Sequence, residues 1–187
     1  MIVPFLVLGY VVGAIPFGVL VARSRGVDIM AVGSGNIGAT NVWRTLGWKP
    51  GLAVFLLDLA KGLVPALVTT QVLNDPFSGF LAGAAAVSGH TLSPFIGFKG
   101  GKGIATGFGM VIGSVPATAF SAFGVFLLVV FTTRYISLGS VFAAISLLAW
   151  GFVYGDSLPL KVAYVVMGAF IVYRHRANLV RLMNGTE

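Results

Sequence analysis

Long apolar stretches dominate this sequence and constrain its fold more than any other feature. They cover roughly residues 2–21, 51–73, 78–98, 103–131, 135–154 and 158–173. A helix needs about 20 apolar residues to span the hydrocarbon core of a bilayer. The chain is also 57% hydrophobic and only 9% charged, unlike a soluble domain. The sequence therefore predicts an all-α integral membrane protein.

The fourth stretch, residues 103–131, is too long for one span. Its middle carries Gly113-Ser114-Val115-Pro116, and glycine and proline in this arrangement interrupt a helix and favour a turn. Dividing the stretch at Pro116 raises the number of crossings from six to seven. The two pieces are short, so we expect them to be tilted or partly re-entrant.

The basic residues decide between these topologies. With seven crossings, Asp75 and Asp156 lie in short loops on one side, and the opposite side holds Arg23, Arg25, Arg44, Lys49, Lys99, Lys102, Arg134, Arg174, Arg176 and Arg181. Loops rich in lysine and arginine stay in the cytoplasm, whereas six crossings would turn the basic C-terminal tail outward. We therefore expect one domain over residues 1–187, a polytopic bundle of seven transmembrane helices with the N-terminus outside and the C-terminus cytoplasmic.

Composition also bears on the kinds of site to expect. The absence of cysteine excludes a disulfide framework, a thiol nucleophile and a thiolate metal site. The net charge of +7 comes from basic residues between the spans, so we expect no nucleic-acid partner. The first apolar run lacks a basic leader and a small-residue cleavage site, and we expect it to remain as the first span.

Three segments dense in glycine and polar residues would meet at the cytoplasmic face. They are GSGNIGATNVWR (33–44), SGHTLSPFIGFKGGKGIAT (88–106) and RHRANLVRLMNGTE (174–187), which we name the first, second and third motifs. The first motif opens with the G-x-G-x-x-G pattern of dinucleotide sites. That pattern requires a preceding buried strand, and here a basic segment and a long apolar run precede it. The glycines therefore do not indicate a dehydrogenase.

The first motif has the residue types of an anion site. A helix starting near Asn36 would align Asn36, Thr40 and Arg44 on one face, with Ser34 in the glycine loop before it. Exposed amides at a helix N-terminus and an arginine fork suit phosphate or carboxylate. The alternative is an interfacial cap whose arginine faces lipid headgroups.

The second motif places lysines and glycines directly before an apolar run. It is not a Walker A motif, because Lys102 is followed by Gly103 and no serine or threonine is present there to hold magnesium. Successive glycine amides, such as those of Gly100 and Gly101, can form an anion nest, to which Lys99 and Lys102 add charge. The alternative is a turn with a positive-inside signal. His90 is more typical of a hydrogen-bonded structural histidine than of a catalyst.

The third motif would place Arg174, Asn178 and Arg181 on one helical face, with His175 adjacent. The alternative is a polybasic end that binds anionic lipid, and we favour it for Arg176 and Arg181. His175 and Asn178 need another explanation and are candidates for a site.

Two further charged residues lie inside the second apolar run. Asp58 and Lys61 fall about 10 to 15 Å along that span. Charges at this depth pair with one another or face a cavity. We expect them to form a buried structural pair.

The three motifs closely resemble, in order and over the whole chain, those of the PlsY family of bacterial membrane acyltransferases. The resemblance implies transfer of a fatty acyl group from acyl phosphate to glycerol 3-phosphate, the first step of phospholipid biosynthesis. The products would be 1-acyl-glycerol 3-phosphate (lysophosphatidic acid) and inorganic phosphate. It also implies seven helices in the bacterial cytoplasmic (inner) membrane, with the active site facing the cytoplasm.

The resemblance assigns roles to residues of all three motifs. The catalytic residues would be Ser34, Arg44, Lys102, His175 and Asn178. These five would also bind substrate, together with Asn36, Thr40, Gly100, Gly101 and Gly103, and Glu187 would be structural. The expected partners are acyl phosphate, glycerol 3-phosphate and membrane lipid. We expect a monomer that needs no metal and no cofactor.

The mechanism is less constrained by the sequence. The H-x-x-x-x-D pair of other glycerolipid acyltransferases is absent after both His90 and His175. Since an acyl phosphate is already activated, positioning and charge stabilisation can supply most of the catalysis. We expect a substrate phosphate oxygen to accept the proton of the attacking hydroxyl, with His175 as an alternative base and nucleophilic Ser34 as the less favoured route.

Two other classes of protein remain as alternatives at this point. A small anion transporter would also use basic glycine loops and intramembrane charges, but its site must be reachable from both faces. A non-catalytic lipid-binding protein would not need three separate phosphate-type motifs.

Overall fold

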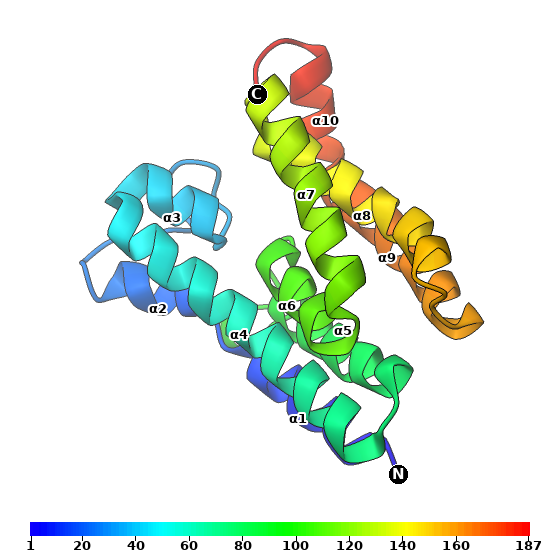
Figure 1. Ribbon diagram of the computed structural model, residues 1–187. Coiled ribbons are helices and arrows are strands. Elements are labelled where there is room, and N and C mark those ends of the chain that lie inside the picture. Colours follow the sequence, from blue (N-terminus) through cyan, green and yellow to red (C-terminus); the bar gives the residue numbers. More distant parts are fainter. The chain divides into compact units, whose positions relative to one another are not determined.

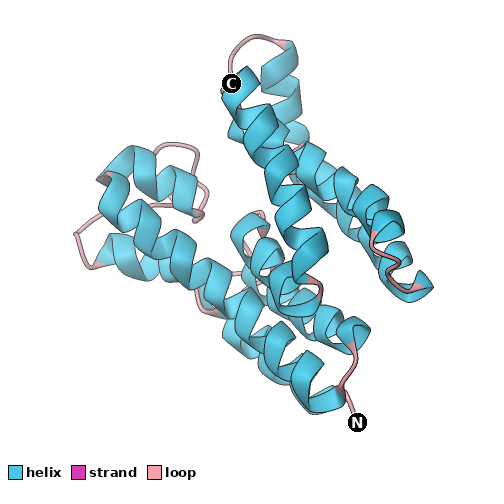
Figure 2. Cartoon of the chain, in the orientation of Figure 1, coloured by secondary structure: helices cyan, strands magenta, loops and turns pink.

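The computed structural model describes residues 1–187, and every regular element in it is a helix (Figure 1 and Figure 2). The all-α prediction is therefore confirmed. In chain order the elements are α1 (Val3–Ala14), α2 (Phe17–Arg23), α3 (Ala39–Leu46), α4 (Trp48–Leu73), α5 (Pro76–Thr91), the 3-10 helix η1 (Pro94–Ile96), α6 (Ile104–Ser114), α7 (Pro116–Thr133), α8 (Ile136–Val153), α9 (Leu158–Arg174) and α10 (Arg176–Met183).

Several helical segments are long and apolar enough to cross a membrane. They are Val3–Arg23, Trp48–Leu73, Pro116–Thr133 and Ile136–Val153. Helices α5, α6 and α9 are shorter, with 16, 11 and 17 residues. The membrane-spanning character of the chain agrees with the sequence, while seven crossings and the orientation of the termini stay predictions.

The chain forms two compact units, Met1–Ser114 and Val115–Glu187. Their boundary is the predicted interruption of the fourth apolar stretch. Helix α6 ends at Ser114, Val115 has the non-helical angles φ −143° and ψ 75°, and Pro116 begins α7. The break in that stretch is confirmed, and a single domain over residues 1–187 stays a prediction.

Glycines allow the helices of the first unit to approach closely. Helix α4 packs along α6 and α5, and α1 packs along α5 (Figure 1). A Cβ atom at Gly62 of α4 would collide with the carbonyl of Thr106 in α6, and one at Gly109 would collide with the carbonyl of Leu59. Small residues at such contacts bring helix backbones together within membranes. These contacts fix α4, α5 and α6 as the frame of the first unit.

The first apolar run forms one candidate span, Val3–Arg23, as expected, but its helix is interrupted within the span. Helix α1 ends at Ala14 and α2 begins at Phe17. Pro16 lies between them and has no N–H to continue the hydrogen-bond ladder. The Lys61 Nζ donates to the carbonyl of Ile15 at 3.0 Å, so a buried lysine satisfies an acceptor that the break exposes.

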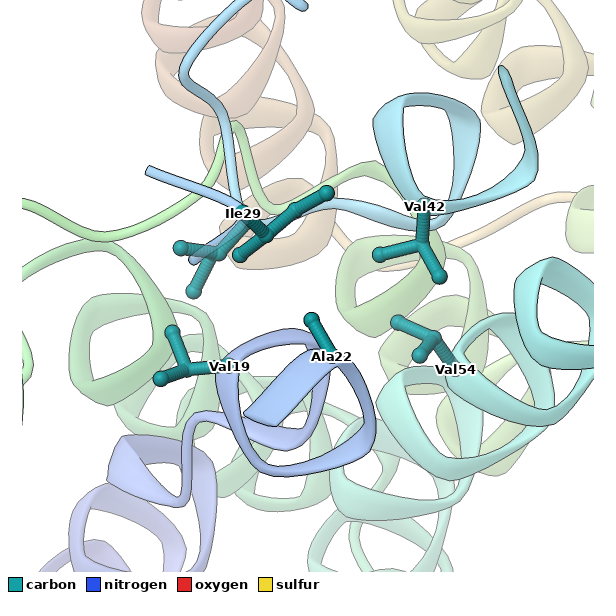
Figure 3. Close-up of a cluster of buried hydrophobic side chains, with 6 residues drawn as sticks. Val19, Ala22, Ile29, Val42 and Val54 are labelled. Atoms are coloured by element: carbon teal, nitrogen blue, oxygen red, sulfur yellow. The ribbon is translucent and has the colours of Figure 1, made fainter. Parts of the chain in front are cut away.

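An apolar cluster holds the first motif in place (Figure 3). It joins α2, the segment before α3, α3 itself and α4, through Val19, Ala22, Ile29, Ile37, Val42 and Val54. Ile96 of η1 packs against the same cluster. The first and second motifs therefore share one core.

The second unit is built from α7 to α10. Helix α8 packs between α7 and α9, and α10 contacts α8 and α9. The loop before α9 is fixed by Asp156, whose Oδ2 accepts hydrogen bonds from Thr118 at 2.9 Å and from the Tyr164 hydroxyl at 2.7 Å. One loop carboxylate thus ties α7 to α9.

Candidate active site

The loop of the first motif differs from the predicted helix start. Helix α3 begins at Ala39, so Asn36 lies before the helix and not on the face of Thr40 and Arg44. Gly35 has φ +66° and Gly38 is extended, which prevents a helix from starting earlier. The Asn36 Oδ1 accepts a hydrogen bond from the Gly38 amide at 2.9 Å. Asn36 therefore shapes the turn into α3.

The other predicted site residues of the first motif lie at the surface of the protein. Ser34 lies in the loop, and Thr40 and Arg44 lie four residues apart on α3. All three are exposed. A hydroxyl on a glycine loop, a second hydroxyl and a guanidinium on one helix face are groups that suit a phosphate.

Asn41 is the residue of this motif that sequence reasoning missed. It is 4% exposed, and its side chain bonds only to the loop before it. The Oδ1 accepts from the Ser34 amide at 3.0 Å, and the Nδ2 donates to Asn36 O at 2.9 Å, Val32 O at 3.1 Å and Ile29 O at 3.2 Å. Its place in the sequence next to the apolar Val42 could have pointed to it, because a polar side chain that is buried beside the core requires hydrogen-bond partners.

The amides of Gly100 and Gly101 are not available for the expected anion nest, because both already donate hydrogen bonds within the protein. The Gly100 amide donates to the Thr91 carbonyl at 3.0 Å, and the Gly101 amide donates to the His90 carbonyl at 3.2 Å. These carbonyls belong to the end of α5, where a helix has unpaired acceptors. Gly100 and Gly101 therefore bind the loop to α5, and Lys102, half-buried beside them, is the charged group at this place.

The second motif is also anchored to α1. The Ser93 hydroxyl donates to the carbonyl of Ala14 at 2.6 Å, and the Tyr10 hydroxyl donates to the carbonyl of Leu92 at 2.9 Å. Ser93 is 1% exposed. The loop that leads from α5 to α6 therefore starts from a fixed position.

A buried charged group lies beneath this loop. The Lys61 Nζ and the Asp58 Oδ1 are 2.8 Å apart, and their side chains are 1% and 3% exposed. The His90 Nδ1 lies 3.7 Å from the same Asp58 oxygen, and the His90 ring underlies Gly101, where an added Cβ would overlap its Nε2. The expected buried pair is present, and His90 lies between it and the glycines of the second motif.

The third motif is not one continuous helical face. Helix α9 ends at Arg174 and α10 begins at Arg176, with His175 at φ −100° and ψ 3° between them. Arg174 is therefore separated from the face of Asn178. His175 is buried, and its Nδ1 lies 2.9 Å from the Ile171 carbonyl. Because a carbonyl can only accept, Nδ1 carries the proton, and Nε2 is the acceptor nitrogen in the neutral ring.

Glu187 closes the third motif on α10. Its carboxylate accepts from Asn178 Nδ2 at 2.6 Å and from Arg181 Nε at 2.8 Å. Burial alone would raise the pKa of the Glu187 carboxyl, but these hydrogen bonds outweigh it and hold the pKa below its usual range. Arg181 therefore has a partner within the protein, and its expected contact with anionic lipid stays a prediction. Arg176 stacks on the Tyr173 ring at 4.2 Å.

The structure brings two of the three motifs together. The first and second motifs lie in the unit Met1–Ser114 and pack on one apolar cluster. The third motif lies in the unit Val115–Glu187. Its placement beside the other two stays a prediction from the sequence, as do the catalytic and binding roles of the individual residues.

Comparison with known proteins shows the family to which the chain belongs. A family model described as glycerol-3-phosphate acyltransferase matches residues 3–185. The chain is 45% identical to the glycerol-3-phosphate acyltransferase of Aquifex aeolicus (strain VF5) over 185 residues, covering 98% of this chain and 96% of the relative. It is 47% identical to that of Geobacter sulfurreducens over 192 residues, covering 96% and 93%.

Solved structures of the same kind are also similar. The crystal structure of PlsY, an integral membrane glycerol 3-phosphate acyltransferase in its glycerol 3-phosphate form, has a TM-score of 0.95 and 43% identity, covering 100% of this chain and 94% of that one. The lysophosphatidic acid form has a TM-score of 0.92 and 42% identity, covering 100% and 93%. The resemblance drawn from the motifs is confirmed, and neither a transporter nor a non-catalytic lipid-binding protein fits it. This chain belongs to the glycerol-3-phosphate acyltransferase (PlsY) family and is an integral membrane acyltransferase of phospholipid synthesis.

Proposed function

We propose that the protein transfers a fatty acyl group from acyl phosphate to glycerol 3-phosphate, forming 1-acyl-glycerol 3-phosphate and releasing inorganic phosphate. The observation that carries this proposal is the first motif, where exposed Ser34, Thr40 and Arg44 stand on a loop and helix fixed by buried bonds. Solved relatives with glycerol 3-phosphate and lysophosphatidic acid forms support the same acceptor and product.

The phosphate groups are bound by side chains more than by glycine amides. Arg44 and Lys102 supply the positive charge, and Ser34 and Thr40 supply hydroxyl donors. Gly100, Gly101 and Gly103 shape the loop that carries Lys102, since the first two amides already bond to α5. From the third motif, His175 and Asn178 are assigned to substrate binding by the same resemblance.

The chemistry is a direct acyl transfer. A glycerol hydroxyl oxygen attacks the carbonyl carbon of acyl phosphate, an ester C–O bond forms, and the bond from that carbon to the phosphate oxygen breaks. The proton of the hydroxyl passes to a phosphate oxygen of one of the substrates. Arg44 and Lys102 stabilise the negative charge that develops at the carbonyl and the leaving phosphate.

The site faces the cytoplasm of a bacterial inner membrane, and the chain acts as a monomer with seven crossings. The basic residues between the apolar segments support this orientation. A site carried by transmembrane helices also lets an acyl chain enter from the bilayer. Acyl phosphate thus enters from the bilayer, and glycerol 3-phosphate enters from the cytoplasm.

The identity of the acyl donor can be tested directly. Purified protein would be given glycerol 3-phosphate with palmitoyl phosphate, palmitoyl-CoA or palmitoyl-acyl carrier protein, without added metal, and lysophosphatidic acid would be measured by mass spectrometry. Product from palmitoyl phosphate alone is the expected result. Product from either thioester, with none from palmitoyl phosphate, would overturn the proposed donor.

A further inference from the structure

The four hydrogen bonds of Asn41 have one property in common. All of them end on main-chain atoms of residues 29–36, and none is made to another helix. Asn41 itself is in the first turn of α3, at a position that is 4% exposed. The carboxamide thus connects a helix of fixed position to the loop that carries Ser34.

The loop is built to receive this side chain. Gly33 has φ +59°, and a Cβ at that position would overlap the Asn41 Oδ1. Gly33 is therefore required for two reasons: its backbone conformation favours glycine, and a side chain would block the Asn41 carboxamide. Gly35, with φ +66°, turns the chain after Ser34. The amide of Ser34 lies between these two turns and bonds to Asn41.

Packing alone does not explain an asparagine at this position. Its neighbour Val42 belongs to the buried apolar cluster, and Asn41 itself is 4% exposed. A buried amide costs free energy unless its polar atoms are paired, so an apolar side chain would serve packing better. Instead, the Asn41 carboxamide pairs with one amide donor and three carbonyl acceptors of an irregular loop, which has no helix or sheet ladder of its own.

We propose that Asn41 is a positioning residue of the active site, which fixes the loop 29–36 so that Ser34 stands in one orientation toward the substrates. This inference rests on the proposed function for the role of Ser34. It predicts that Asn41 acts on the rate of the chemical step more than on the assembly of the fold.

The test combines hydrogen exchange with kinetics. Asn41→Ala removes all four bonds, and Asn41→Asp keeps the size while replacing the donor of three of them by an oxygen. The matched control is Thr69→Val, which removes a buried hydroxyl that donates to Pro65 O at 2.7 Å within α4, away from the motifs. Circular dichroism in detergent checks the helical fold of each variant.

Both Asn41 variants should speed exchange of the amides in residues 30–38 by about tenfold or more. They should lower kcat by about a hundredfold, as a displaced catalytic group does, with less than about a threefold change in KM for palmitoyl phosphate. Thr69→Val should leave exchange in that segment and kcat unchanged. If Asn41→Ala is too unstable to purify, the isosteric Asn41→Asp decides the result.

Wild-type exchange in residues 30–38 of an Asn41 variant, or wild-type kcat in Asn41→Asp, would overturn the inference. Equal losses of activity in Thr69→Val would overturn it too, because they would indicate general destabilisation. A wild-type protein without acyltransferase activity would refute the proposed function instead. The exchange measurement does not depend on activity, so the two failures can be told apart.

Discussion

The carboxylate of Glu187 holds the segment after α10 against that helix, through Asn178 and Arg181. The family resemblance implied a structural role for Glu187, and the geometry agrees with that role. Asn178 was expected in the site and Arg181 at the lipid surface, yet both donate to this one carboxylate. One carboxylate therefore orders the end of the third motif.

This contact makes stability depend on pH in a defined direction. The pKa of Glu187 is lowered from its ordinary 4.5, so its contribution is full above that value and is lost as the pH falls through the lower folded pKa. The Arg181 side chain is 43% exposed, which limits the contribution to below about 1 kcal/mol. The melting temperature of wild type should exceed that of Glu187→Gln at about pH 6, and the two should converge once the pH falls below the folded pKa of Glu187. A difference that persists at lower pH would contradict this assignment.

Gly101 packs directly against the imidazole ring of His90. Gly101→Ala would place a Cβ on the imidazole and displace the loop that carries Lys102. We expect kcat/KM for glycerol 3-phosphate to fall by about ten- to a hundredfold in a steady-state assay. Gly124→Ala is the control, because it lies within α7 with nothing within 4 Å of an added Cβ and should retain wild-type activity. Wild-type kinetics in Gly101→Ala would be incompatible with this packing.

At the scale of the elements, the apolar runs of the sequence predicted where the helices lie, because burial in a bilayer requires them. The break at Pro116 was marked by glycine and proline and could be predicted. The break at Pro16 was missed, since a count of apolar residues passes over a proline within a run. The break at His175 carries neither glycine nor proline, so the sequence does not mark it, and only the backbone angles of His175 show it.

The candidate site was predictable to a similar degree. Residues that carry charge or hydroxyl groups, such as Arg44 and Lys102, could be proposed as site residues from their chemistry and spacing. Asn41 was missed because an amide within a helix resembles a surface residue until its partners are known. The role of Gly100 was wrong in part, since sequence cannot tell whether an amide points to a ligand or to the end of a helix.

The break between α1 and α2 depends on a charge in α4. Lys61 bonds to both Asp58 and the carbonyl of Ile15, so Lys61→Met would leave a buried carboxylate without its partner. We expect a loss of about 3–5 kcal/mol in the free energy of unfolding, measured by denaturation in detergent. The double variant Asp58→Asn/Lys61→Met should recover most of that loss, because it buries no charge. A double variant as unstable as Lys61→Met would show that the pair is not the cause.

At the scale of the whole molecule, the number of crossings decides which loops share a side. Seven crossings place Arg25 and Ser157 on opposite sides of the membrane, whereas six place them on the same side. Both residues are exposed, and the natural sequence has no cysteine to interfere. In intact cells, a membrane-impermeant maleimide should label Ser157→Cys, and it should label Arg25→Cys only after permeabilisation. Labelling of both variants in intact cells, or of neither, would contradict the seven-crossing topology.

The central claim is that acyl phosphate and glycerol 3-phosphate react at the first and second motifs. Its most direct test is the release of inorganic phosphate by the purified protein in detergent or lipid mesophase, given palmitoyl phosphate with and without glycerol 3-phosphate and no added metal. Release should require both substrates, should fall by about a hundredfold or more in Arg44→Ala, and should persist in Arg25→Ala, an exposed arginine outside the motifs. No release from palmitoyl phosphate with either substrate combination, or equal release in Arg44→Ala, would contradict the account.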